Sequence, residues 1–132
     1  MQLGEHNVYQ QIGDDGFDRL TTAFYQRVTT DDILGPMYAQ AMIREGESDH
    51  EPARIRLRDF LIQRFGGPPR YSEARGHPRL RMRHMPFAID EAARDRWLEL
   101  MDESLREAEI KDPAKSVMQA VFAHIADFMR NR

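Results

Sequence analysis

His84 has the most distinctive surroundings of the histidines, because it lies between two prolines in the run Gly76–Phe87. Pro78 can open a helix, whereas Pro86 cannot continue one and disfavours helical backbone just before it. We therefore expect His84 at the C-terminal end of a helix of barely two turns. So short a helix is marginal in water, and either packing or a bound ligand must hold it. A histidine that merely interacts with the last carbonyls of its helix is the alternative interpretation.

Arginines accompany this histidine. They gather between Arg54 and Arg83, in a chain that has few lysines. A guanidinium group holds carboxylates in a fixed fork, which suits planar anionic partners. A haem carries two propionates, and it needs basic groups beside a histidine and an apolar pocket. An RNA phosphate would also fit the arginines, and a solvated surface is the plainest interpretation.

Helical spacing of apolar residues predicts the elements that position these groups. Phe17, Leu20, Phe24 and Val28 recur at three- and four-residue steps, with Asp14 or Asp15 as the expected N-cap. A short turn over 31–34 is expected to stop near Gly35-Pro36. The next helix is predicted from about Pro52 to Phe65, with Leu57, Phe60 and Leu61 on its buried stripe.

Prolines and glycines predict a loop over residues 66–78. A long helix is expected to begin at Asp90, with Trp97 and Met101 on its inner stripe. The pair Asp112-Pro113 predicts the start of a last helix that buries Val117, Val121, Ile125 and Phe128. With no convincing strand, the fold class is all-α, with four substantial helices.

Composition narrows the function further. The 132 residues fit one domain over 1–132, and the formal net charge of -3 argues against a nucleic-acid partner. The absence of cysteine excludes disulfides, cysteine metal sites and covalent haem attachment through cysteine. Neither a secretory signal nor an apolar run long enough to span a bilayer is visible. We expect a soluble, cytoplasmic protein with no membrane partner.

The run Gly66–Phe87 closely resembles the loop and proximal helix of the group II truncated haemoglobins. Four further features align around it and extend the resemblance from Val8 to Met129: Phe24-Tyr25, Tyr38, Leu57 with Phe60-Leu61, and the run Arg94–Leu98. The resemblance implies a globin-like fold, a two-over-two helical sandwich around haem b. It also identifies the chain as a single truncated-globin domain.

The family pattern assigns roles to individual residues. His84 matches the proximal iron ligand, whose second ring nitrogen should donate to a backbone carbonyl near Leu80. The residues matched to the distal ligand pocket are Tyr25, Tyr38, Trp97, Leu57, Ala53 and Phe24. The residues matched to haem contact or propionate binding are Arg56, Phe60, Leu61, Tyr71, Leu80, Arg81, Arg83 and Phe87, with Arg79 in reserve. Taken without the resemblance, Trp97 and Tyr25 would be interpreted as core residues.

The resemblance implies reversible binding of O₂, CO or NO. Several donors around the ligand imply tight O₂ retention, which suits scavenging, sensing or redox chemistry better than bulk oxygen transport. NO dioxygenase or peroxidase activity would need an unidentified reductant. We expect a monomer or weak homodimer. The alternative is a haem-free, globin-like module that binds an acidic partner through its arginine-rich face.

Two segments depart from the family pattern. Its paired N-terminal glycines correspond here to Gly13-Asp14-Asp15-Gly16. The segment Ala39–Glu51 is several residues longer than usual and is expected to form an extra turn over 40–44, which affects Tyr38 and the pocket entrance. His77 is interpreted as structural, while His6, His50 and His124 are interpreted as surface or helix-face residues.

Overall fold

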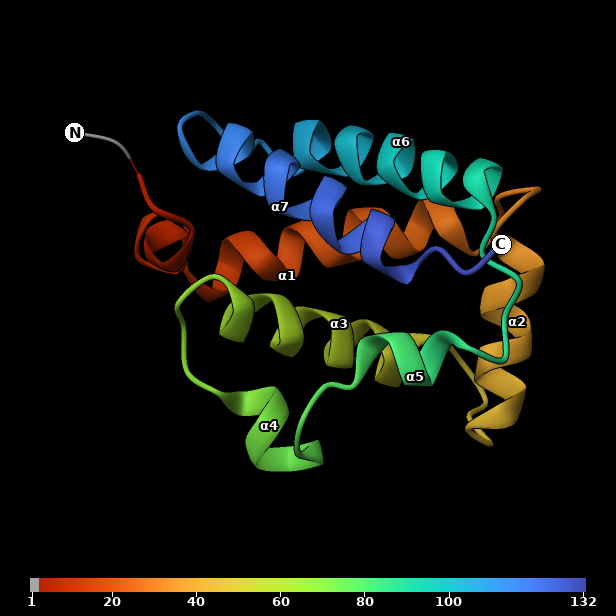
Figure 1. Cartoon of the computed structure of the whole chain (residues 1–132). Coiled ribbons are helices and arrows are strands. Elements are labelled where there is room, and N and C mark those ends of the chain that lie inside the picture. Colours follow the sequence, from red (N-terminus) through yellow and green to blue (C-terminus); the bar gives the residue numbers. More distant parts are fainter. Residues whose placement is uncertain (1–2) are drawn as a thin grey trace.

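A computed structural model describes residues 3–132, which form helices with no strand in that range. The four longest helices are α1 (Val8–Val28), α3 (Glu51–Arg64), α6 (Glu91–Glu107) and α7 (Ala114–Met129). α1 packs against α3, α6 packs against α7, and α1 also contacts α6, which joins the two pairs (Figure 1). The all-α, two-over-two expectation is therefore confirmed. Within residues 3–132, no helix combines the length and the apolar character needed to cross a membrane.

Three shorter helices border these pairs: α2 (Gly35–Arg44), α4 (Arg70–Arg75) and α5 (Leu80–His84). A 3₁₀ turn, η1, covers Glu5–Asn7. In Figure 1, α5 lies below α7, which it contacts, while α2 closes one end of the molecule. The short helices therefore line the space between the two pairs.

The structure adds a helical segment before the predicted start of the first helix, and the predicted part follows the bend at Gly13. The helix begins at Val8 and bends at Gly13, which has φ 65° and ψ -179°. Neither predicted N-cap starts the helix, and Asp14 instead accepts hydrogen bonds from Tyr9 and Arg70. Glycine adopts this backbone geometry without the steric cost of a Cβ.

The residues Gly35-Pro36 begin α2 rather than ending a turn, which is a second correction. The Asp31 carboxylate accepts hydrogen bonds from the amides of Ile33 at 3.1 Å and Leu34 at 3.0 Å. Proline at the first helical turn has no amide to leave unsatisfied, so the same dipeptide suits a helix start. The extra turn predicted over 40–44 is the second half of this helix.

A third correction concerns the predicted loop over 66–78, because α4 lies inside it. The predicted end of the preceding helix at the glycines is confirmed, because α3 ends at Arg64. Gly66 has a φ of +95°, and a Cβ there would lie 1.7 Å from the carbonyl oxygen of His6. The helix starts that the sequence predicts at residues 52 and 90 agree with the observed starts of α3 and α6 to within one residue. The carboxylate of Asp90 accepts from the amide of Ala93 at 2.8 Å and caps α6.

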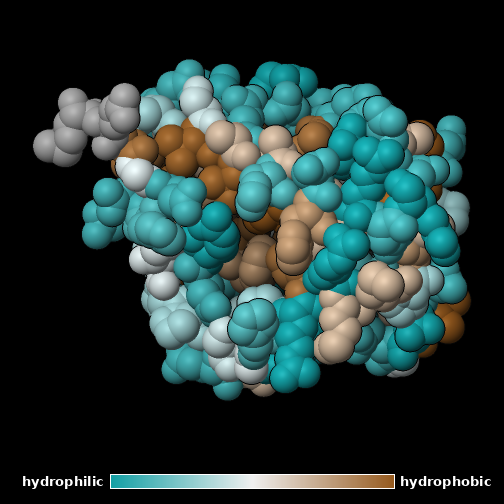
Figure 2. Space-filling model, viewed as in Figure 1, coloured by the Kyte–Doolittle hydropathy of each residue, from teal (hydrophilic) through white to brown (hydrophobic). Residues whose placement is uncertain are grey.

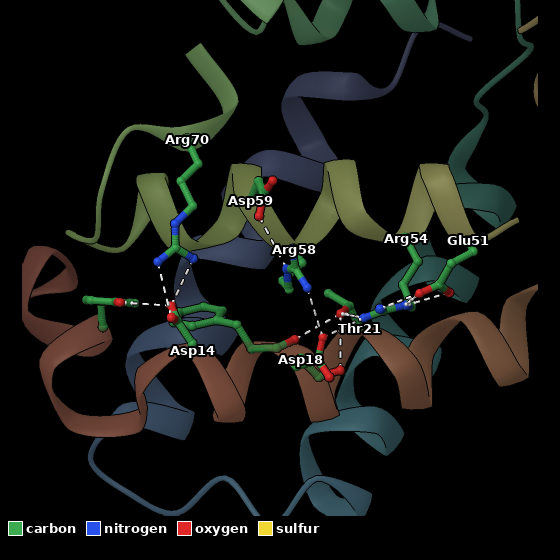
Figure 3. A network of polar contacts seen from close by, with 10 residues as sticks. Asp14, Asp18, Thr21, Glu51, Arg54, Arg58, Asp59 and Arg70 are labelled. Atoms are coloured by element: carbon green, nitrogen blue, oxygen red, sulfur yellow. Dashed lines mark hydrogen bonds and ion pairs between the residues drawn. The ribbon is translucent and has the colours of Figure 1, made fainter. Parts of the chain in front are cut away.

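Ion pairs on one face fasten α3 to α1 (Figure 3). Asp18 of α1 accepts from Arg54 at 3.0 Å and from Arg58 at 3.1 Å. Arg54 also pairs with Glu51 one turn earlier on its own helix. These contacts fix the start of α3 against α1, which matters because both helices contribute to the site.

Candidate functional site

A cavity of about 530 Å³ lies between the two helix pairs, with walls from every α-helix from α1 to α7. Figure 2 shows apolar side chains at the bottom of a hollow on one face of the molecule. Most of the exposed lining is apolar, which is typical of sites for small molecules and cofactors.

His84 stands at the end of α5 and lines this cavity. Its Nδ1 lies 2.7 Å from the carbonyl oxygen of Leu80, one turn back, which agrees with the contact expected from the family pattern. That contact requires a proton on Nδ1 and leaves the lone pair of Nε2 available. Burial lowers the pKa of His84, and the hydrogen bond to Leu80 only partly opposes this, so the ring is neutral at pH 7.

Contacts from outside α5 hold this short helix in place. The Arg81 guanidinium donates to the carbonyl of Phe128 at 2.8 Å and lies 6.0 Å from the centre of that residue's ring. The Asn131 side chain donates to the carbonyl of Phe87 at 2.9 Å, just beyond the helix. The C-terminal end of α7 therefore positions His84.

Three of the ring side chains that line the cavity and carry polar hydrogens gather around one residue: Tyr25 of α1, Tyr38 of α2 and Trp97 of α6. All three pack edge-on around Phe24, at centroid distances of 5.7, 6.1 and 5.9 Å respectively. Phe24 itself is fully buried and is not part of the cavity lining. It forms the support against which the three donors are oriented.

The two phenols keep their protons at neutral pH. Burial, and then the neighbouring Tyr38, raise the pKa of Tyr25 far above its ordinary value. Burial raises the pKa of Tyr38 to about 12, against a smaller opposing effect of hydrogen bonding from Trp97. Within residues 3–132 the Tyr25 hydroxyl has no hydrogen-bond partner, so its proton is free for a ligand in the cavity.

The other predicted contact residues divide into two groups. The lining includes Ala53 and Leu57 on the ligand side, together with Arg56, Phe60, Leu61, Tyr71, Leu80, Arg83 and Phe87. Arg81 lies outside the lining and ties α5 to α7 instead. Arg56 lines the cavity, but Glu47 holds it through two contacts of 2.6 and 3.0 Å. Three other lining arginines, Arg44, Arg75 and Arg83, form no ion pair among the described residues.

Several residues that line the cavity were not predicted from the sequence. His50 lines the cavity, although the sequence suggested a surface position. The inner face of α2, including Met37, Ala41 and Met42, was missed because the helix itself was not predicted. The spacing of those residues is the signal that could have revealed it.

The arginine-rich face is largely neutralised by the chain's own carboxylates. The five arginines from Arg54 to Arg70 all form ion pairs, with acidic partners from η1, α1, α3 and the segment before α3. The remaining arginines in the run lie on or beside α4 and α5. The pairing therefore neutralises the part of the run from Arg54 to Arg70, whereas Arg75, Arg79, Arg81 and Arg83 are exposed and form no ion pair within residues 3–132.

The donor set fits an iron held within a porphyrin better than an iron held by side chains alone. No group of three or more potential metal-ligating side chains occurs within residues 3–132. The cavity offers one imidazole oriented by a backbone carbonyl, that of His84, together with apolar walls and, on other elements, ring donors. A ring cofactor that supplies the remaining metal ligands is compatible with this arrangement.

Comparisons with known proteins place the fold in a family. Residues 7–131 match the family model described as "Bacterial-like globin". The chain is 36% identical over 128 residues to the two-on-two hemoglobin-3 of Arabidopsis thaliana, covering 96% of this chain and 70% of that protein. It is 36% identical over 97 residues to the group 2 truncated hemoglobin YjbI of Bacillus subtilis, covering 74% and 67%.

Solved structures agree with this placement. The haemoglobin of Chloroflexus aurantiacus superposes with a TM-score of 0.85 at 47% identity, covering 95% of this chain and 98% of that one. The truncated oxygen-avid haemoglobin of Bacillus subtilis gives a TM-score of 0.84 at 31% identity, covering 94% and 98%.

Proposed function

The chain belongs to the bacterial-like globin family, among the group II truncated haemoglobins, and on that basis we propose that it binds haem b through His84 and holds O₂ or a similar diatomic ligand beneath Tyr25, Tyr38 and Trp97. The observation that carries this proposal is the pairing of one oriented, neutral imidazole with a group of ring donors in a single cavity. The experimental test is an absorption spectrum, described below.

The lining residues divide the remaining tasks. Phe60, Leu61 and Phe87 provide apolar contact for the porphyrin. Of the arginines carried by α4 and α5, Arg83 and Arg75 are the better candidates for the propionates, since both line the cavity and neither is engaged by a carboxylate within residues 3–132. Tyr71 is buried against Phe60, at a centroid distance of 5.9 Å, and can add a hydroxyl donor.

When bound, the haem would supply an iron that can take up a diatomic ligand. His84 would hold the iron from α5, with its imidazole oriented by the contact with the Leu80 carbonyl. The Tyr25 hydroxyl would donate a hydrogen bond to the ligand, and Trp97 and Tyr38 would add donors from α6 and α2. Each hydrogen bond to a charged acceptor contributes about 1.5–3 kcal/mol and slows release accordingly.

Two or more such donors favour retention of O₂ over its delivery. Ligand scavenging, ligand sensing or redox chemistry is therefore the proposed role rather than bulk transport. Turnover as an NO dioxygenase or a peroxidase would require an electron donor, and its demonstration requires kinetics with that donor supplied.

The spectral test uses the whole chain, expressed with haem supply and also titrated with haemin. We expect uptake of one haem per chain, a Soret band, a five-coordinate ferrous form after dithionite, and a shift on adding CO. Protein that stays colourless after haemin addition would overturn the proposal and favour the haem-free interaction module.

A further inference from the structure

A second hollow, of about 450 Å³, lies on the outer surface where α1 meets the start of α3. Three residues of α1, namely Thr22, Tyr25 and Gln26, line it together with the C-cap Thr29 at helical spacing, so they form one stripe. His50, Glu51 and Arg54 form the opposite wall. This outer hollow is open to solvent, whereas the cavity lies deeper.

The outer hollow and the cavity share two lining residues, Tyr25 and His50. Their side chains therefore stand between the two spaces. The ring centroids are 6.2 Å apart and the planes are inclined by 47°. Aromatic rings in direct contact have such separations, so the partition is closed in this structure.

The residues around this partition are held by ion pairs and hydrogen bonds, whereas the two rings are not. Arg54 is held by Asp18 and Glu51, and the Thr29 hydroxyl donates to the Tyr25 carbonyl at 2.8 Å. By contrast, the His50 ring and the Tyr25 hydroxyl form no hydrogen bond within residues 3–132. Packing alone keeps the rings together, and a partly exposed side chain can change rotamer on a fast timescale.

Charged side chains on other parts of the cavity lining hinder ligand entry there in the haem-loaded protein. Arg75 and Arg83 are among the lining residues, and the proposed function assigns them to the haem carboxylates. Arg56 also lines the cavity, and Glu47 holds it through a bidentate ion pair. A diatomic ligand therefore needs another passage.

We propose that the outer hollow is the entry chamber for the diatomic ligand, and that His50, turning away from Tyr25, is the gate into the cavity. This inference rests on the proposed function. His50 controls the rate of entry, while Tyr25 also acts on the ligand after it has entered. The polar rim of Thr22 and Gln26 leads to a partition that a small neutral molecule can pass when the rings separate.

The test compares variants that open the gate with variants that plug the chamber. His50→Ala removes one of the two rings, and the strength of a typical aromatic contact predicts entry about 2- to 13-fold faster. Thr22→Trp fills the chamber and should slow entry severalfold. Thr30→Trp is the matched control, because this exposed residue follows α1 and is not in either lining. Gln26→Trp provides a second plug if Thr22→Trp does not fold.

Two measurements separate entry from ligand binding. The first is bimolecular CO association after flash photolysis of the haem-loaded protein. The second uses protein loaded with zinc protoporphyrin, in which dissolved O₂ quenches the porphyrin triplet state without binding to the metal. We expect both rates to rise in His50→Ala, to fall in the plugged variants, and to stay unchanged in Thr30→Trp.

Rates that remain at the wild-type value in both the opened and the plugged variants would overturn the proposed gate, and so would equal slowing by Thr22→Trp and Thr30→Trp. Porphyrin uptake is read from the Soret band of the same samples. Absence of uptake in the wild-type chain would overturn the proposed function itself, so the two failures are distinguishable.

Discussion

Replacing Tyr25 by phenylalanine should accelerate release of O₂ from the haem-loaded protein. The substitution removes one hydroxyl and keeps the ring, so the edge-on contacts with Phe24 and Tyr38 and the packing against His50 remain. No protein group within residues 3–132 loses a hydrogen bond, because none bonds to that hydroxyl. The measured change therefore reports the interaction with the ligand rather than damage to the pocket.

The expected size follows from the energy of that hydrogen bond. A hydrogen bond to an acceptor with negative charge contributes about 1.5–3 kcal/mol, which corresponds to release about 10- to 150-fold faster. Burial raises the pKa of Tyr25, so the phenol keeps its proton at pH 7. The hydroxyl is therefore available as a hydrogen-bond donor, and we expect the full change in the release rate.

The assay mixes the O₂-loaded protein with excess CO in a stopped-flow instrument and follows the displacement. Tyr9→Phe is the matched control, because its hydroxyl donates to Asp14 at 2.8 Å outside the cavity. Equal dissociation rates for Tyr25→Phe, Tyr9→Phe and wild type would refute the assignment of Tyr25 as a ligand donor.

Three other perturbations test the site and the fold. Trp97→Phe should also speed O₂ release in the same stopped-flow assay, while an unchanged rate would remove the indole from the donor set. Gly66→Ala should lower the free energy of urea unfolding by at least about 2 kcal/mol, because the new Cβ would meet the carbonyl of His6. Gly76→Ala is the control, since open space surrounds its Cβ, and it should lower the free energy of unfolding by only about 1 kcal/mol. Equal losses in the two variants would contradict this prediction. Asp31→Asn should lower the free energy of unfolding by about 1–3 kcal/mol at pH 7. Burial raises the pKa of Asp31, but hydrogen bonds from two backbone amides and from an arginine outweigh that effect and leave the pKa below the ordinary 3.8. The stabilisation is therefore present above pH 3.8 and is lost as the pH falls through the folded-state pKa. Urea unfolding curves of the Asp31→Asn variant and wild type that differ equally at pH 7 and well below 3.8 would contradict the linkage.

The sequence predicts the long helices well because their boundaries depend on local chemistry. Asp90 caps its own helix, and Pro52 lies in the first turn of α3. Gly35-Pro36 was misinterpreted because the same pair can end one turn or begin another helix. The Asp31 side chain, which accepts two amides ahead of α2, favours the second outcome.

The site was predictable where a role depends on residues within one turn, and less so where it depends on distant partners. The contact between His84 and the Leu80 carbonyl follows from four-residue spacing in a helix. The partner of Arg56 is Glu47, and that of Arg81 is the end of α7. Such pairings arise only after the helices pack, so the sequence alone does not show which arginines remain unpaired and available to the propionates.

The position of His50 illustrates the same limit. The residue lies at the start of α3, where helical spacing says little about which way a side chain faces. Only the packing of α1 against α3 brings its ring to that of Tyr25. The sequence therefore indicates the donors more readily than the route that leads to them.

Chemical rescue of His84→Gly tests the iron ligand most directly. The measurement is the iron–histidine stretching band of the ferrous, haem-reconstituted protein, recorded by resonance Raman spectroscopy with and without added imidazole. We predict that the band is present in wild type, absent in the variant, and restored when free imidazole fills the space left on α5. An unchanged band in the variant without imidazole would contradict the role of His84.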